Sequence, residues 1–234
     1  MNKTVVITGG TSGYGLAIAK KFKGIGYTVL ITGRDDERLL KAQKESGADF
    51  IFKQDVKSYN GWLALKKYAI EKMHKVDVLV NNAGGGVSIK PIEEQNEQTI
   101  NDILALNLSS VMYAANVFVS DMKARKKGTI VNISSVCATH AWADWSVYAA
   151  AKAGVLNFTK GLQVELQPFG VRASCVIPAS ASTGFQKAAN LNETQDSLSV
   201  EDIAETVVFV AEMPERAIVE DVTVWGMSQT VQPL

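Results

Sequence analysis

The feature that most constrains the fold is a regular alternation of short apolar, β-branched runs with longer amphipathic segments. Most of the short runs are apolar without interruption, which is typical of parallel strands covered on both faces. Alternation of this kind implies βαβ units, whose right-handed crossovers build a doubly wound sheet. We therefore predict an α/β protein, a single domain over residues 1–234, with seven strands in one parallel sheet and helices on both faces.

The boundaries of the elements follow from these runs and from the residues that interrupt them. Strands are predicted at residues 4–8, 28–32, 49–53, 76–81, 129–134, 172–178 and 221–225, and helices at 15–23, 36–45, 60–73, 98–126, 145–167 and 200–212. Pro168 and Gly170 end the fifth helix. In doubly wound sheets, ligands bind beyond the carboxyl ends of the strands, so the residues that follow each strand are the candidates for a site.

Composition excludes several classes of protein. The 24 basic residues balance the 24 acidic ones, which argues against a nucleic-acid partner. No apolar run approaches the ~20 residues of a membrane helix, and the apolar start is too short for a signal peptide. We therefore expect a cytoplasmic protein with no membrane partner. Cys137 and Cys175 have no metal-ligand spacing, so we expect no metal site.

A glycine-rich turn, T-G-G-T-S-G-Y-G at residues 8–15, follows the first strand. Its glycines allow a tight turn and a close approach to a pyrophosphate, and the helix that follows offers free N–H groups at its positive end. The spacing G-x-x-x-G-x-G differs from G-x-G-x-x-G and from a Walker loop. A glycine-rich turn that binds nothing is the alternative interpretation.

The residues after the second strand bear on cofactor choice. An NAD-binding unit usually has a carboxylate here for the ribose 2′-OH, whereas this chain has Gly33 and Arg34. A guanidinium suits a 2′-phosphate, so we predict a preference for NADP(H), with NAD(H) still able to bind. Asp35 and Asp36 are interpreted as the acidic start of the next helix. A solvated surface charge is the alternative for Arg34.

The chemically most specific residues follow the fifth strand. Ser135 comes directly after that strand, and Tyr148 and Lys152 follow at a spacing that puts them on one face of a helix. A nearby ammonium stabilises a phenolate, so Lys152 is expected to lower the pKa of Tyr148 toward the range useful for acid–base catalysis. An isolated Y-x-x-x-K is more often a core tyrosine beside a surface lysine, but this pair follows two nucleotide-type turns.

Taken together, these motifs resemble the short-chain dehydrogenase/reductase family over essentially the whole chain. In chain order, they are the turn at residues 8–15, Asp55-Val56, Asn81-Asn82-Ala83-Gly84, Asn107, Ser135, Tyr148-x-x-x-Lys152 and Pro178. The resemblance implies a Rossmann fold and an NADP(H)-dependent oxidoreductase of the carbonyl reductase type. It would reduce a ketone or aldehyde to the alcohol, reversibly.

The resemblance also implies a role for each residue. Tyr148 would be the catalytic acid and Ser135 would hydrogen-bond the carbonyl oxygen. Lys152 would lower the tyrosine pKa and bind the nicotinamide ribose, and Asn107 would bend its helix and hold a relay water. The implied cofactor contacts are Gly9, Thr11, Ser12, Gly13, Tyr14, Arg34, Asp55, Val56, Asn82, Ala83, Gly84, Tyr148, Lys152, Pro178, Ala179 and Thr183.

The substrate pocket is expected from the loop before Tyr148 and from a short lid near residues 180–198. His140, Trp142, Trp145 and Phe185 would line it. Its tryptophans and phenylalanine suggest a small apolar or aryl carbonyl or alcohol, unless the tryptophans pack in the core or in a subunit interface.

Other interpretations of assembly and function stay open. The resemblance implies a homodimer or homotetramer. One alternative function is an NADP-dependent dehydrogenase of a hydroxy acid or sugar alcohol. Another is a non-catalytic NADP-binding regulatory protein, which typically would have lost the tyrosine or the lysine.

Overall fold

The computed structural model describes residues 2–86, 88–180 and 198–229 of the chain. Its strands are β1 (Thr4–Ile7), β2 (Thr28–Gly33), β3 (Phe50–Lys53), β4 (Val78–Asn81), β5 (Gly128–Ile133), β6 (Val171–Pro178) and β7 (Asp221–Val224). Its longer helices are α1 (Gly13–Gly24), α2 (Asp36–Ser46), α3 (Tyr59–Met73), α4 (Glu97–Leu104), α5 (Ser110–Arg125), α6 (Ser146–Leu166) and α8 (Val200–Ala211). Short 3₁₀ turns are η1 (Ile92–Glu94), η3 (Val136–Ala138) and η4 (Gln167–Phe169).

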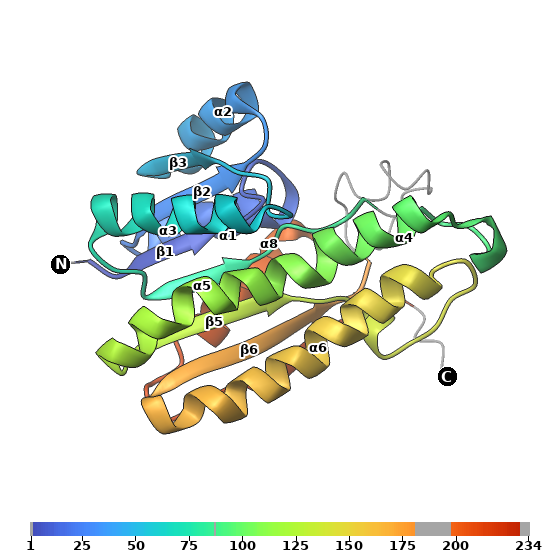
Figure 1. Ribbon diagram of the computed structural model, residues 1–234. Coiled ribbons are helices and arrows are strands. Elements are labelled where there is room, and N and C mark those ends of the chain that lie inside the picture. Colours follow the sequence, from blue (N-terminus) through green and yellow to red (C-terminus); the bar gives the residue numbers. More distant parts are fainter. Residues whose placement is uncertain (1, 87, 181–197, 230–234) are drawn as a thin grey trace.

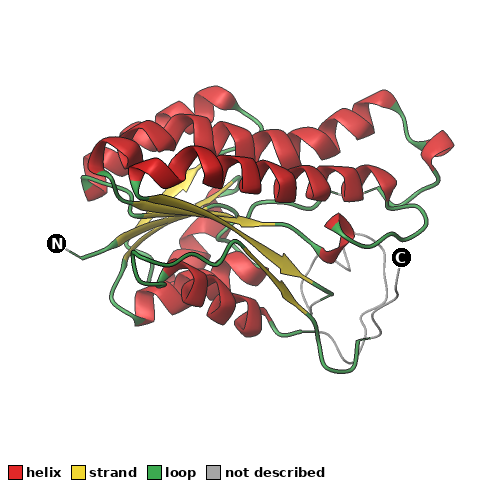
Figure 2. Cartoon of the chain, turned by 90° about the horizontal axis from the view of Figure 1, so that it is seen from below, coloured by secondary structure: helices red, strands yellow, loops and turns green. Residues whose placement is uncertain are grey.

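The seven strands form one parallel sheet in the order β3-β2-β1-β4-β5-β6-β7. Helices α3, α5 and α6 cover one face, and α1, α2 and α8 lie on the other (Figures 1 and 2). The chain order reverses direction between β1 and β4, which is the point where ligands bind in sheets of this type. The predicted doubly wound α/β fold is confirmed.

The side chains of each strand point alternately to the two faces of the sheet, which explains why an apolar core lies on both faces. In β1, Val5 and Ile7 contribute to the apolar cluster under α1 and α8, whereas Val6 between them contributes to the cluster under α3 and α5. All three side chains are completely buried. Successive side chains of a strand point to opposite faces, so a strand that is covered on both sides must be apolar at every position.

The helix predicted at residues 98–126 is interrupted. A π-helical turn, η2 (Ala105–Ser109), separates α4 from α5. Within it the Asn107 side chain donates to the carbonyl oxygen of Ile103, 3.0 Å away. Such a turn widens the helix locally and is frequent at functional sites.

The helical segment Glu97–Arg125 is relevant to the expectation that no apolar run is long enough to cross a membrane. Among the described residues, this is one helical stretch long and apolar enough to cross a membrane by length and composition. Polar residues such as Asn101, Asn107 and Asn116 interrupt this segment, so it is not an uninterrupted apolar run. In the structure α5 packs on β5 and between α3 and α6, and a core helix passes the same test.

Candidate active site

The turn between β1 and α1 has the properties of a phosphate-binding loop. Gly9 has a positive φ of 66°, and a Cβ added there would lie 3.0 Å from the Cα of Ala83. No side chain caps the first turn of α1, although Ser12 occupies the N-cap position. In contrast, the N-cap side chains of α2, α3 and α4 each accept a backbone N–H. The α1 terminus therefore keeps its donors for a ligand.

Asn82 joins the end of β4 to this turn. Its side-chain amide donates to the carbonyl oxygen of Thr8 at 2.9 Å. In return, the Thr8 hydroxyl accepts the backbone N–H groups of Asn82 and Ala83, at 3.1 and 3.0 Å. The Asn82 side chain thus holds the glycine-rich turn in place, and Ala83 and Gly84 follow it along the same edge of the sheet.

The structure brings a second cation to the β2 end of the site, which the sequence analysis missed. Arg34 is exposed directly after β2. Arg38, in the first turn of α2, directs a guanidinium nitrogen to 3.4 Å from the Ser12 hydroxyl oxygen. Asp35 caps α2 by accepting the Arg38 N–H at 2.8 Å, in agreement with its interpretation as a helix-start residue. The Arg38 guanidinium therefore lies at the phosphate-binding turn, and Arg34 follows the adjacent strand β2.

The predicted contacts after β3 and β6 lie at the same edge of the sheet. Asp55 is exposed, whereas Val56 is buried and accepts the indole N–H of Trp62 through its carbonyl. Pro178 is the last residue of β6, and the Ala179 N–H continues the pairing with β7. Thr183 and Phe185 lie outside the described residues, as does most of the lid predicted near 180–198.

Four polar side chains meet where β5, the π-helical turn and α6 approach one another. Ser135 caps η3 directly after β5, and Tyr148 and Lys152 lie one turn apart on α6. The Lys152 ammonium donates to the Ile133 carbonyl oxygen at 3.0 Å and lies 5.6 Å from the centre of the Tyr148 ring. Tyr148 and Lys152 are both buried, with exposed fractions of 8% and 4%.

Asn107 is tied to the loop after β4 through both ends of its amide. Its Oδ1 accepts the Gly85 N–H at 2.9 Å, and its Nδ2 donates to the Gly85 carbonyl oxygen at 2.9 Å. A Cβ added at Gly84 would lie 3.0 Å from this Oδ1 and 3.3 Å from the Lys152 Nζ. A glycine is therefore needed beside Lys152, because a side chain would fill the space next to both groups.

Burial is the largest cause of the pKa shifts of Tyr148 and Lys152 on α6. It raises the pKa of Tyr148 well above the ordinary value, and the hydrogen bond with Ser135 offsets only part of this rise. It also lowers the pKa of Lys152 to about 8. In this arrangement desolvation has the larger effect on Tyr148, and the Lys152 ammonium donates to Ile133, so the lowering of the tyrosine pKa by Lys152 stays a prediction.

The expected aromatic wall divides into two parts. Trp145 lies edge-on to Tyr148, with ring centres 5.7 Å apart, and joins an apolar cluster that also contains Cys137. His140 lies instead between Trp142 and Trp225, and both tryptophans pack on the core. Cys137 and Trp225 were not predicted as site residues. The spacing of Cys137, two residues after Ser135, was the one available signal for it.

Among the residues the structure describes, no group of three or more His, Cys, Asp or Glu side chains could hold a metal ion. The polar groups that converge at this edge are hydroxyls, an amide and an ammonium. Together with the uncapped α1 terminus and the two arginines, they could hold a phosphorylated dinucleotide next to a tyrosine and a lysine able to transfer protons.

Comparison with known proteins agrees with this geometry. A family model described as short chain dehydrogenase matches residues 3–194. A probable NADP-dependent dehydrogenase of Haemophilus influenzae is 30% identical, covering 97% of this chain and 94% of the relative. The NADP-dependent 3-hydroxy acid dehydrogenase of Salmonella typhi is 29% identical, covering 97% and 96%.

Comparison with solved structures also finds oxidoreductases in complex with NADP. The closed form of serine dehydrogenase complexed with NADP+ superposes with a TM-score of 0.93 at 26% identity, covering 99% of this chain and 98% of that one. A metagenomic short-chain oxidoreductase in complex with NADP has a TM-score of 0.84 at 28% identity, covering 95% and 96%. The chain belongs to the short-chain dehydrogenase family. It is an NAD(P)-dependent oxidoreductase that acts on CH–OH groups.

Proposed function

We propose that this enzyme is an NADP(H)-dependent carbonyl reductase, which reduces an apolar or aryl ketone or aldehyde to the alcohol and catalyses the reverse reaction. The observation that carries the proposal is the convergence of Ser135, Tyr148, Lys152 and Asn107 at the carboxyl edge of the sheet. The apolar surroundings of Tyr148, which include Ile103, support an apolar substrate.

The residues present fit a nicotinamide cofactor with a 2′-phosphate. The uncapped α1 terminus would receive the pyrophosphate, and Arg34 and Arg38 would bind the 2′-phosphate. The NADP-dependent names of the relatives support the same preference. When bound, the cofactor supplies or accepts the hydride.

The protein side of the reaction is a proton transfer. Burial raises the pKa of Tyr148, so its phenol is protonated at neutral pH and can donate to the carbonyl oxygen during reduction. The Ser135 hydroxyl would hydrogen-bond the same oxygen and hold it at the phenol. Lys152 would bind the nicotinamide ribose, and Asn107 would hold a relay water that connects Lys152 to solvent.

The test is Tyr148→Phe, which removes the acidic hydroxyl and keeps the ring. NADPH-dependent reduction of a phenyl ketone should fall by about 10²–10⁴-fold, as expected for loss of a general acid, while the NADPH dissociation constant changes less than about twofold, because cofactor contacts elsewhere remain. Tyr59→Phe, on the exposed surface of α3, is the matched control. A Tyr148→Phe variant that keeps most of the rate contradicts the proposal.

A second candidate is oxidation of a hydroxy acid, which the relative from Salmonella typhi favours by name. The loop 136–147 between Ser135 and Tyr148 contains no Lys or Arg to bind a carboxylate, which favours a neutral substrate. NADP+ reduction with a 3-hydroxy acid and with a phenyl carbinol separates the two candidates. Cofactor binding without turnover on any carbonyl or alcohol would support the non-catalytic alternative.

We also propose that the enzyme acts in the cytoplasm as a homodimer or homotetramer. The resemblance to the short-chain dehydrogenase family supports self-association. Light scattering of the purified protein gives the assembly directly.

A further inference from the structure

The connection between Ser135 and Tyr148 is anchored at its middle by a residue from the end of the chain. His140 contacts Trp225 edge-on, with ring centres 5.4 Å apart, and also contacts Trp142, with ring centres 6.1 Å apart. The backbone N–H of His140 donates to the Val136 carbonyl oxygen at 2.9 Å. The imidazole therefore contacts two indole rings, one from its own loop and one from the end of the chain.

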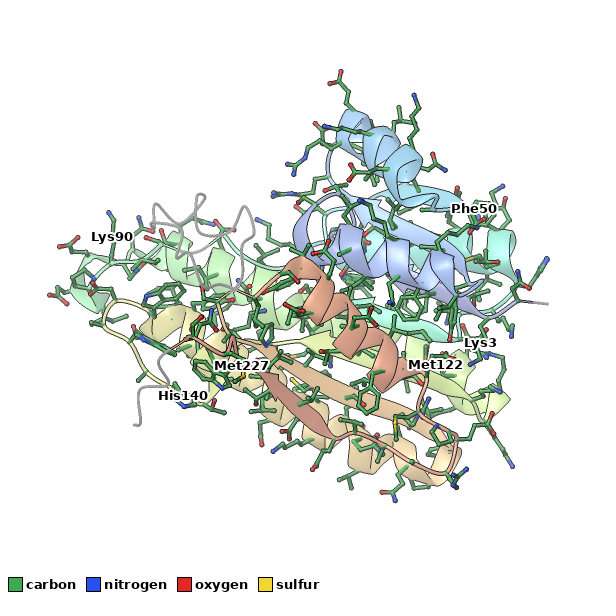
Figure 3. All side chains as sticks on the ribbon, turned by 180° about the vertical axis from the view of Figure 1, so that it is seen from behind. Lys3, Phe50, Lys90, Met122, His140 and Met227 are labelled. Atoms are coloured by element: carbon green, nitrogen blue, oxygen red, sulfur yellow. The ribbon has the colours of Figure 1, made fainter. Side chains whose placement is uncertain are left out.

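The segment that supplies Trp225 is itself held firmly. Trp225 directly follows β7, and the last residue of that strand, Val224, accepts the Ala179 N–H at 2.9 Å. Beyond it, the Gln229 side chain accepts the Gly226 N–H and donates to the Ser180 carbonyl oxygen. The segment 225–229 therefore bridges the end of β6 and the loop around His140. Figure 3 shows His140 and Met227 at the same end of the molecule, opposite Lys3.

The anchored loop continues directly to the candidate acid. Trp142 accepts the Trp145 N–H at 3.4 Å, in a turn that places Asp144 at a positive φ of 70°. The Trp145 ring then lies edge-on to Tyr148. Because the turn between the two tryptophans is short and hydrogen-bonded, a shift of Trp142 would also shift Trp145 against Tyr148.

We propose that Trp225 is a specificity-determining positioning residue: through His140 and Trp142 it holds the loop that places Trp145 beside the substrate of Tyr148. The inference rests on the proposed carbonyl reductase function and adds the segment after β7 as a further part of the substrate site. A bulky phenyl substrate, which needs Trp145 in place, depends on this anchoring, whereas a short aliphatic ketone does not.

The first experiment compares Trp225→Ala with Trp225→Phe on a phenyl ketone and a short aliphatic ketone. An aromatic pair contributes enough for about a tenfold effect. We expect kcat/KM of Trp225→Ala to fall about that much for the phenyl ketone, mainly through KM, and to stay within about twofold for the aliphatic ketone. Trp225→Phe should recover most of the loss, because it restores an aromatic contact. Phe209→Ala, exposed on α8, is the control.

A double-mutant cycle tests the route through His140. If Trp225 acts through that side chain, adding Trp225→Ala to His140→Ala should reduce kcat/KM for the phenyl ketone by less than about twofold, because coupled residues are not additive. Equal losses on both ketones, or full additivity with His140→Ala, would overturn the inference.

Hydrogen exchange of the loop tests the anchoring without any substrate. Trp225→Ala should speed amide exchange across residues 139–145, whereas Phe209→Ala should leave it unchanged. If the wild-type enzyme reduces no carbonyl at all, the proposed function fails. The exchange experiment would still test the anchoring of the loop by Trp225. Unchanged amide exchange in Trp225→Ala would refute it.

Discussion

Replacing Lys152 by methionine should make the protein more stable at neutral pH while removing its activity. The Lys152 side chain is 4% exposed, and the one hydrogen bond described for its ammonium is to the Ile133 carbonyl oxygen, at 3.0 Å. Burial lowers its pKa from 10.5 to about 8. In the unfolded chain water solvates the ammonium again, so the pKa returns to the ordinary value.

The sign of the effect follows from the proton count. Below pH 8 both states hold the proton, and the folded state carries the full cost of a buried charge. The two pKa values differ by about 2.5 pH units, and one unit corresponds to about 1.4 kcal/mol, so the cost is about 3 kcal/mol at pH 7. Above pH 8 the folded state releases the proton first, and the cost falls to about 1 kcal/mol at pH 9.5. The stability contribution of Lys152 therefore rises with pH in this window.

Lys152→Met keeps a side chain of similar length and removes the charge, but it also loses the hydrogen bond to Ile133, worth about 1 kcal/mol. The variant should be about 2 kcal/mol more stable than the wild type at pH 7 and about equal at pH 9.5. Urea denaturation of both proteins without cofactor, at the two pH values, measures the difference. Lys67→Met, on the exposed surface of α3, is the control for the loss of a lysine side chain.

A Lys152→Met variant that differs from the wild type by the same amount at both pH values would refute the reasoning, because it would show that the folded protein does not release the proton early. Turnover provides the independent check of function. The stabilised variant should have lost carbonyl reduction, since the proposed function needs a buried ammonium at this position even though it lowers stability.

Two further predictions concern arginines. Arg38→Ala should weaken NADPH binding at least about tenfold and NADH binding less than about twofold, because the guanidinium beside Ser12 that is proposed to bind the 2′-phosphate is lost. Fluorescence titration with both cofactors measures this, with Lys41→Ala on the same helix as control, and equal weakening of both would contradict it. Arg172→Ala should destabilise the protein by about 3 kcal/mol in urea, since Arg172 donates to Thr129, to the carbonyl group of the last residue of α8 and to three carbonyl groups after α8. A loss below about 1 kcal/mol would show that water replaces these bonds.

Much of the candidate site could be predicted because its residues are close in sequence. The spacing of Tyr148 and Lys152 puts them on one helix face in any α-helix, and the turn at residues 8–15 forms between one strand and the next helix. Such local arrangements depend on helix period and on glycine conformation, which act within a few residues. The seven strands were predictable for the same reason, since β-branched apolar runs with this spacing have few alternatives.

Other properties of the site come from contacts between distant segments. Arg38 meets Ser12 across 26 residues, and Trp225 meets His140 from the opposite part of the chain, so no local spacing could indicate either contact. Periodicity tells which face of an element is buried, but not which other element covers it.

The sequence by itself determined the chemical groups, their order and the doubly wound sheet that carries them to one edge. Only the tertiary structure decided their electrostatics. It encloses Tyr148 and Lys152 so completely that desolvation, rather than their mutual spacing, governs both pKa values. Desolvation depends on everything packed around a group, and α6, β5, the loop after β4 and the π-helical turn come together only when the whole sheet has formed.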